Sequence, residues 1–323
     1  MYGVKIYSVP ADISGTIKRW LELGLDTIMT GRECLKNKDF IDAVRSAGIR
    51  LSIVEPIFLA PENKPEQELS VDQNGQIAHE DWVRFICPSD TEELEKVYAR
   101  IAEDAKLGPD CLTLDFIRFF QFWEMTSPDA DPKSFRKTCY CEKCQAVRKT
   151  FSSEEEWRCS VITSTVKKCV ELIKNINQNI KIGIHIVPWK PEMFDGALKN
   201  INGQDLKEIT KYVDFLAPMT YHHMIHQPVS YISELIKSHR NYISDSRPVI
   251  PSVQAKEIYR TDKLSVDEIA DAIRSALDGS VSGITFYHWG DIEESPDVYN
   301  VIKDAIAKDK KDKAQFFNTS LCI

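Results

Sequence analysis

The sequence lacks the features of several large classes of protein. No run reaches the roughly 18 to 20 consecutive apolar residues that a membrane-spanning helix needs. The opening stretch MYGVKIYSVP has no basic segment followed by an apolar one, so no signal peptide is expected. The net charge is −8, and basic residues gather only on a few helix-like segments and in the run KDKKDK at 308–313. We therefore expect neither a membrane nor a nucleic acid as a partner.

The cysteine usage disfavours a disulfide framework. The chain has 9 cysteines, an odd number, and they are scattered except for one cluster. Cys34, Cys111 and Cys169 lie among apolar residues, as small core side chains do. This usage is typical of a reducing compartment, so we expect a cytoplasmic protein.

What the sequence does have is a regular alternation of apolar and amphipathic segments. Apolar segments that resemble strands lie at 4–9, 25–31, 50–59, 110–120, 181–189, 214–224, 248–255 and 282–292. Amphipathic segments that resemble helices lie at 13–24, 38–48, 91–108, 157–176, 203–213, 229–243, 265–279 and 295–309. Apolar strands separated by helices indicate a parallel sheet that is covered on both faces. Eight such units predict an α/β protein of the (β/α)8 TIM barrel type.

Two longer polar segments interrupt this pattern. They are insertions at about 60–90, after the third strand, and 121–156, after the fourth. No linker is visible, so we expect a single barrel over 1–310 followed by a C-terminal tail at 311–323. An open doubly wound sheet is the alternative. No G-x-G-x-x-G turn follows the first strand, which weakens a nucleotide-binding function.

The predicted ends of the strands carry the candidate functional residues, because the chemistry of a TIM barrel takes place there. Carboxylates can serve as acid, base or nucleophile, and aromatic faces can stack on sugar rings, as glycoside chemistry requires. The candidate catalytic residues are Asp115, Glu55 and Asp291, with Glu293 close by. The candidate substrate-binding residues are Arg118, His185, Trp189, Tyr221, His222, Gln254, His288 and Trp289.

Asp115 is the leading catalytic candidate because it lies within an apolar strand. A buried carboxylate costs several kcal/mol unless it is paired or functional. A structural ion pair with Arg118 is the alternative interpretation. Glu55 could instead hydrogen-bond a loop, and Asp291 could be an ordinary solvated loop carboxylate.

Neighbouring histidines raise the possibility of a catalytic metal. His222 and His223 are followed by His226, but HHMIH has no glutamate after its first histidine and so lacks the helical H-E-x-x-H pattern of zinc proteases. Consecutive strand residues face opposite sides, so one histidine of the adjacent pair is expected to point away from the site. We expect His288 and Tyr221 to hydrogen-bond a substrate, and Trp289 to stack on it.

The stretch FRKTCYCEKCQ, at 135–145, holds the cysteine cluster. Cys139, Cys141 and Cys144 can bind one tetrahedral ion from a tight turn, but a closed structural zinc site needs a fourth ligand. Cys87, in RFICPSD on the preceding insertion, is the natural choice. Basic residues around the motif would offset the thiolate charge: Arg136, Lys137, Lys143, Arg148 and Lys149. Structural zinc is favoured, with free thiols, a disulfide within the loop and an iron–sulfur cluster as alternatives.

The order of these four cysteines resembles the zinc-binding arrangement of glycoside hydrolase family 42 β-galactosidases. CPSD before a helix, followed after a strand by CYCEKC, is similar to that family over roughly residues 85–151. The resemblance implies a structural zinc bound by Cys87, Cys139, Cys141 and Cys144, in a barrel that acts on carbohydrate. It does not extend to the catalytic pair of that family, because LDFIRF replaces the strand-four Asn-Glu and PSVQA, with Gln254, replaces the strand-seven Glu.

Together these patterns predict a glycoside hydrolase with a barrel stabilised by structural zinc and a carboxylate pair that includes Asp115. One alternative is a catalytically silent barrel that binds carbohydrate. Another is a hydrolase with a catalytic metal bound by histidines.

Overall fold

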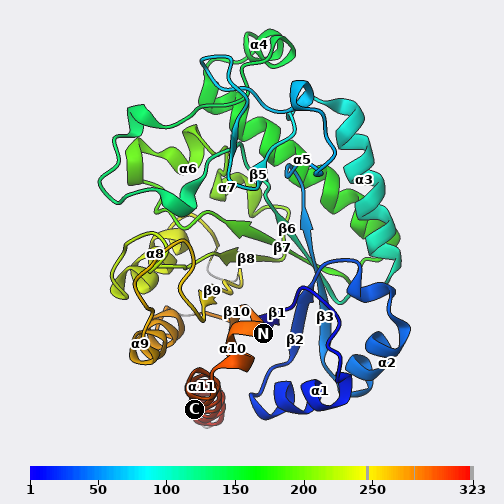
Figure 1. Cartoon of the computed structure of the whole chain (residues 1–323), viewed down its shortest axis with the longest axis vertical. Helices are drawn as coiled ribbons and strands as arrows, with labels where there is room; N and C mark the ends of the chain where they lie inside the picture. Colours follow the sequence, from blue (N-terminus) through cyan, green and yellow to red (C-terminus); the bar gives the residue numbers. More distant parts are fainter. Residues whose placement is uncertain (245–246, 280, 321–323) are drawn as a thin grey trace.

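Eight parallel strands form the centre of the protein, which is described by a computed structural model over residues 1–244, 247–279 and 281–320 (Figure 1). Neighbouring strands follow the order β8-β7-β6-β3-β2-β1-β10-β9. Their bounds are β1 (Tyr2–Lys5), β2 (Thr27–Thr30), β3 (Arg50–Pro56), β6 (Cys111–Asp115), β7 (Lys181–Ile186), β8 (Phe215–Pro218), β9 (Ser252–Gln254) and β10 (Ile284–Tyr287).

The two ends of this strand order also meet. Parallel bridges join Leu216 to Val249 and Met219 to Ser252, and the Thr220 N–H donates to the Ser252 carbonyl at 2.8 Å. The sheet therefore curves round until β8 lies beside β9. The predicted (β/α)8 TIM barrel is confirmed.

Helices surround the barrel and cover the outer face of the strands (Figure 1). Polar side chains begin several of them: Asp12, Asn37, Asp90, Ser153 and Ser265 each accept a hydrogen bond from a backbone N–H of the first turn. The helices are α1 (Ile13–Glu22), α2 (Lys38–Ser46), α3 (Thr91–Lys106), α4 (Glu142–Arg148), α5 (Glu154–Ile176), α6 (Ala197–Asn200), α7 (Leu206–Ile209), α8 (Ser230–Arg240), α9 (Val266–Leu277), α10 (Trp289–Glu294) and α11 (Pro296–Ser320). Within the described ranges, none of them is long and apolar enough to cross a membrane.

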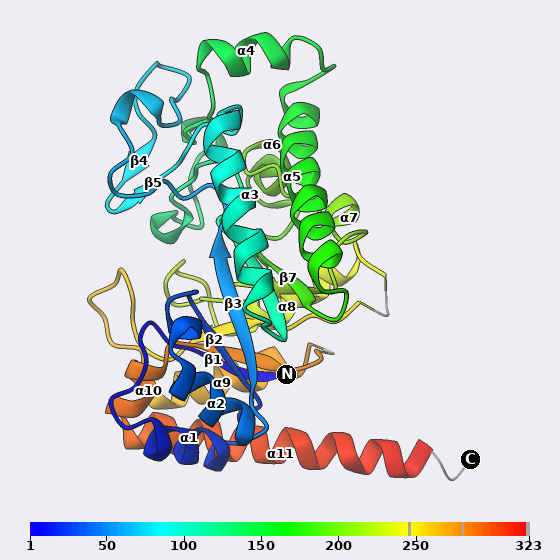
Figure 2. The same ribbon diagram turned by 90° about the vertical axis from the view of Figure 1, so that its right-hand side faces the viewer.

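Two excursions extend the barrel at the carboxyl ends of its strands. The segment between β3 and α3 contains the short hairpin β4 (His79–Glu80) and β5 (Val83–Arg84). The segment between β6 and α5 contains two 3₁₀ turns (Trp123–Met125 and Pro132–Ser134) and α4. Figure 2 shows both segments at the end of the molecule opposite α11.

The structure differs from the predicted elements in a few places. The fourth strand ends at Asp115 rather than continuing to 120, because Phe116 has a positive φ of 48° and turns the chain. Only one helical turn, α7, forms within 203–213. Helix α11 continues through the first part of the expected tail to Ser320, and 321–323 lie outside the described residues.

Candidate active site

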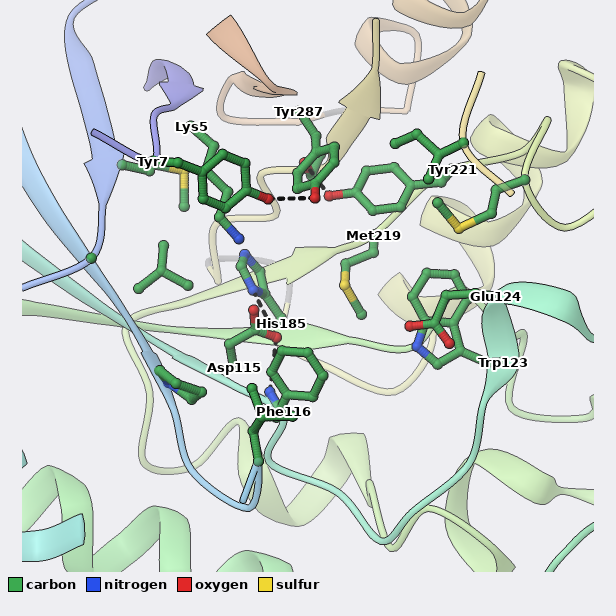
Figure 3. Close-up of a pocket in the computed structure, with 18 of the residues that line it drawn as sticks. Lys5, Tyr7, Asp115, Phe116, Trp123, Glu124, His185, Met219, Tyr221 and Tyr287 are labelled. Carbon is green, nitrogen blue, oxygen red and sulfur yellow. Dashed lines mark hydrogen bonds and ion pairs between the residues drawn. The ribbon is translucent and has the colours of Figure 1, made fainter. Parts of the chain in front are cut away.

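A cavity of about 570 Å³ opens at the carboxyl ends of the barrel strands. Residues from at least six strand ends contribute to its wall, together with residues from both excursions. The polar and aromatic residues that line it are Lys5, Tyr7, Trp82, Asp115, Phe116, Arg118, Trp123, Glu124, His185, Tyr221, Ser252, Tyr259, Phe286 and Tyr287 (Figure 3). Of the sequence candidates, Asp115, Arg118, His185 and Tyr221 are therefore brought together here.

Asp115 is the last residue of β6, and its side chain faces the cavity. One carboxylate oxygen lies 3.2 Å from Nδ1 of His185 on β7 and accepts a hydrogen bond from the Phe116 N–H at 2.8 Å. Burial by itself would raise the pKa of Asp115. His185, Lys5 and the Phe116 N–H outweigh burial and hold that pKa well below its usual range. Asp115 is therefore ionised at neutral pH.

Glu124 is a second carboxyl group in the same cavity, and it comes from the first 3₁₀ turn of the excursion after β6. It is 8% exposed, and its Oε1 lies 4.0 Å from Nη2 of Arg118. Burial raises the pKa of Glu124 to about 7, although Arg118 opposes the shift. Figure 3 shows Asp115 and Glu124 on opposite sides of the cavity.

Arg118 holds the loop that carries Glu124. Its guanidinium donates to the carbonyls of Gln121 at 2.7 Å and Phe119 at 3.4 Å, and it lies 5.0 Å from the ring centroid of Phe85. The ion pair that it makes is with Glu124 rather than with Asp115. The structure therefore does not have the Asp115–Arg118 ion pair that was the alternative interpretation of Asp115.

Aromatic side chains form much of the remaining wall. The hydroxyls of Tyr7 and Tyr287 are hydrogen-bonded to each other, and the hydroxyl of Tyr221 lies 3.0 Å from Oγ of Ser252. Trp82, from the excursion after β3, is 56% exposed, and its indole N–H donates to the Tyr259 hydroxyl at 2.8 Å. Exposed aromatic faces of this kind can stack on sugar rings.

Glu55 is not brought to the cavity. Its neighbours Val54 and Pro56 line the cavity, and because successive strand residues face opposite sides, Glu55 points to the outer face of β3. There it pairs with Arg100 of α3 and interacts with Asp104. It is a buried carboxylate of the barrel-to-helix interface.

The candidates beyond β10 also lie elsewhere, because the chain turns directly into α10. Asp291 is 3.4 Å from Nε2 of His288 and 3.8 Å from Nζ of Lys256, and none of these three lines the cavity. The indole of Trp289 packs edge-on against Trp20, with ring centroids 5.9 Å apart. Trp289 therefore belongs to the packing between α10 and α1.

The three remaining candidates, His222, Gln254 and Trp189, do not line the cavity, and each has a structural partner. His222 lies 3.0 Å from Glu268. The Gln254 side chain accepts from the Met224 N–H at 3.2 Å and donates to the Lys256 carbonyl at 2.9 Å. The Trp189 ring stacks on Phe135, with centroids 5.5 Å apart, and so holds the excursion after β6.

Glu124 and the wall residues Lys5, Tyr7 and Trp82 were missed from the sequence. Glu124 and Trp82 lie on the excursions, whereas the sequence candidates were taken from the strand ends. One signal was available: Glu124 follows the aromatic run FQFW at 120–123, an unusual place for an acid on a solvated loop. Lys5 and Tyr7 belong to the first strand end, from which no candidate was taken.

The four cysteines form a separate cluster between the two excursions. The sulfur atoms of Cys87, Cys139, Cys141 and Cys144 all lie within 4.8 Å of one another, and Cys87 Sγ is 3.4 Å from both Cys141 Sγ and Cys144 Sγ. These separations exceed the roughly 2.05 Å of a disulfide bond. They suit four ligands around one ion with metal–sulfur bonds of about 2.3 Å. The predicted cluster is confirmed as a group that could hold a metal ion.

Among the residues that the structure describes, no second group of His, Cys, Asp or Glu gathers closely enough to hold a metal ion. His222 and His223 have separate carboxylate partners: Glu268 at 3.0 Å and Asp262 at 3.3 Å. The structure therefore offers no ligand set for the alternative of a histidine-bound catalytic metal.

Comparison with solved structures finds TIM-barrel glycoside hydrolases, which confirms the resemblance predicted from the sequence. The PgaB (BpsB) glycoside hydrolase domain from Bordetella bronchiseptica is similar with a TM-score of 0.72 at 12% identity, over 93% of this chain and 97% of that domain. No protein-family model matches the sequence, and no curated protein matches it.

Two β-galactosidases share the fold over most of this chain. The enzyme from the Antarctic haloarchaeon Halorubrum lacusprofundi has a TM-score of 0.72 at 9% identity, over 96% of this chain and 58% of that one. A catalytic mutant of Gan42B, a GH42 β-galactosidase from G. stearothermophilus, has a TM-score of 0.69 at 11% identity, over 96% and 56%. This chain thus spans less than three-fifths of either β-galactosidase. At these identities the likeness establishes the fold.

Proposed function

We propose that this protein is a glycoside hydrolase in which Asp115 and Glu124 form the catalytic pair. The observation that carries the proposal is that two carboxyl groups face one cavity with pKa values shifted in opposite directions. Glycoside hydrolysis needs one carboxylic acid and one carboxylate on either side of the scissile bond. Two such groups whose environments separate their pKa values have the expected acid and base roles.

Each carboxyl group has a role that follows from its charge. Glu124, which keeps its proton up to about pH 7, would donate that proton to the glycosidic oxygen as the bond breaks. Asp115 would act on the anomeric carbon as the nucleophile, or would activate a water molecule as the base. His185 would hold the Asp115 carboxylate in position, since its Nδ1 lies 3.2 Å away.

The wall of the cavity suits a carbohydrate. Trp82 and Tyr259 present aromatic faces at its mouth, and Tyr7, Tyr221 and Tyr287 add hydroxyl groups that can bond to sugar hydroxyls. The glycoside hydrolases among the structural neighbours support the same substrate class. Glu124 takes the place, in this proposal, of the partner acids considered from the sequence, Glu55 and Asp291.

We propose zinc as the ion of the four-cysteine cluster, in a structural role. A closed set of four thiolates is typical of structural zinc and leaves no open position for a substrate. The cluster lies apart from the cavity, because none of its residues lines the cavity wall. Its effect on activity would come through the excursions that it joins.

A screen of aryl glycosides tests the function. Wild-type protein should release the chromophore from at least one sugar, whereas Asp115→Asn should bind that substrate without turning it over. Calorimetry with the matching sugars would supply the binding measurement. Binding without turnover by both proteins would contradict the enzyme and favour the silent carbohydrate-binding barrel.

A further inference from the structure

Lys5 is a cationic residue in the wall of the cavity that the proposed chemistry does not use. It is the last residue of β1, and its side chain lies among aromatic rings. The Nζ atom is 5.3 Å from the ring centroid of Tyr7 and 5.3 Å from that of Tyr287. In Figure 3 the Lys5 side chain points into the cavity beside these two tyrosines.

Lys5 has no polar partner among the residues that the structure describes. Across residues 1–244, 247–279 and 281–320, its ammonium group makes no hydrogen bond and no ion pair, whereas Arg118 is bonded to two carbonyls and lies 4.0 Å from Glu124. Burial lowers the pKa of Lys5, and the charge of Asp115 only opposes this effect. An ammonium group without a partner is unfavourable in such surroundings, and a bound anion would relieve the unfavourable term.

The charge of the whole cavity also favours an anionic ligand. With Glu124 protonated, Lys5 and Arg118 contribute two positive charges to the wall and Asp115 contributes one negative charge. A single carboxylate on the substrate would offset this excess, and Lys5 is the cation that is free to receive it.

We propose, on the basis of the glycoside hydrolase function above, that the cavity takes a uronic acid residue and that Lys5 binds its carboxylate. The sugar would present its anomeric carbon to Asp115 on β6 and the carboxylate at carbon 5 to Lys5 on β1. The rings of Tyr7 and Tyr287 lie beside Lys5, and the Tyr287 hydroxyl, which accepts from Tyr7, can donate its own proton to the same carboxylate. Lys5 is thus a specificity-determining residue for an acidic glycoside.

Binding of free sugars tests this assignment without relying on turnover. Isothermal titration calorimetry would compare D-glucuronate with D-glucose and D-galacturonate with D-galactose. We expect at least one uronate to bind about 10-fold to 100-fold more tightly than its neutral parent, as a charge-assisted contact allows. Lys5→Met should remove that preference with little change in neutral-sugar affinity, and Lys5→Arg should restore part of it. Lys18→Met, at an exposed site on α1, is the matched control and should keep the preference.

Thermal melting would confirm that each variant is folded. A wild-type protein that binds no uronate more tightly than its neutral parent would overturn the assignment, as would a preference that survives Lys5→Met.

Turnover separates the assignment from the proposed function. A set of 4-methylumbelliferyl uronides and their neutral counterparts would be assayed in parallel. Uronate binding that depends on Lys5, without hydrolysis of any substrate, would support the assignment and contradict the enzyme. Hydrolysis of neutral glycosides without any preference for uronate would support the enzyme and overturn the assignment.

Discussion

Two pairs of buried carboxyl groups lie on opposite faces of the same barrel wall, and only one of them can reach a substrate. In the cavity, Asp115 has a lowered pKa and Glu124 a raised one. Behind β3, Asp104 has a pKa raised by burial and by the nearby Glu55. Each pair also has an arginine beside it: Arg118 in the cavity, and Arg100 of α3 behind the strand.

The two pairs differ clearly in their access to solvent. The cavity pair opens to solvent at the carboxyl ends of the strands, whereas Asp104 and Glu55 are packed between β3 and the helices, where Arg32 also reaches Asp104 at 3.0 Å. A raised pKa follows from burial in both places. A raised pKa therefore indicates catalysis only where a substrate can approach. Asp104 and Glu55 are out of reach of a substrate, so we assign them a structural role.

We expect the largest effect when one carboxyl group of each pair is replaced and the activities of the two variants are compared. Asp115→Asn should lower kcat/KM by about 1,000-fold or more, because it removes the proposed nucleophile or base. Glu55→Gln should leave the kcat/KM of the folded protein within about threefold of wild type, since Glu55 does not touch the cavity. Steady-state assays on the best aryl glycoside measure both. An equal loss of kcat/KM in Asp115→Asn and Glu55→Gln would contradict the distinction between the two pairs.

Removing the proposed zinc should disturb the cavity pair and spare the other. The cluster joins the excursions that carry Trp82 and Glu124, so chelation should lower the melting temperature by about 5 °C or more. Activity should fall in step with the loss of folded protein. Metal analysis before and after chelation, beside a melting curve, provides the measurement. Immediate inactivation of a fully folded protein would contradict a structural role.

Glu124→Gln should lower kcat by about 100-fold to 10,000-fold on substrates with poor leaving groups, because it removes the proposed general acid. In the proposed mechanism, activity needs Glu124 protonated and Asp115 ionised. It should therefore fall as the pH rises through about 7, and again in strong acid as Asp115 takes up a proton. The alkaline fall should be absent from the pH profile of Glu124→Gln. A profile unchanged by the substitution would remove Glu124 from this role.

Asp104→Asn should change stability rather than activity. A carboxyl group whose pKa is raised on folding favours the folded state at low pH, and this contribution is lost as the pH rises above the usual carboxyl range. The amide cannot ionise, so the variant should gain about 2 kcal/mol relative to wild type toward alkaline pH. Urea unfolding at a series of pH values measures this gain. A constant difference between the proteins at every pH would argue that Asp104 does not titrate.

Trp82→Ala should have the smallest effect on activity, because Trp82 lies at the mouth of the cavity. Loss of one aromatic face should raise KM about fivefold with kcat nearly unchanged, because stacking contributes roughly 1 kcal/mol. Steady-state kinetics on an oligosaccharide substrate provide the measurement. A change in kcat without a change in KM would place Trp82 nearer to the chemistry.

Much of the fold was predictable because its signals are local and repeated. Eight apolar segments alternate with amphipathic ones, and each became a strand of the barrel. The cysteine cluster was predictable because C-x-C-x2-C spacing restricts three ligands to one turn, with Cys87 as the remaining partner. Asp115 was found because an acid inside an apolar strand conflicts with its surroundings.

The composition of the cavity was harder to predict, because it depends on how side chains are turned and on the paths of long loops. Glu55 shares a strand end with residues of the cavity wall, yet a one-residue difference in the alternation turns it to the other face. Glu124 comes from a 3₁₀ turn whose position depends on Arg118 and on packing around Phe85. No periodicity in the sequence encodes such a contact.

The junction between the two excursions has a consequence for how this protein can be altered. Besides the cysteines, the Tyr140 N–H donates to the Val71 carbonyl at 3.0 Å, and Arg136 lies 3.3 Å from Asp72, so the excursions adhere through backbone and side chains alike. Together they contribute Trp82 and Glu124 to the cavity, to which the barrel strands contribute Asp115 and Lys5. A loop exchange with another barrel that aims to change the cavity would therefore have to replace both excursions together.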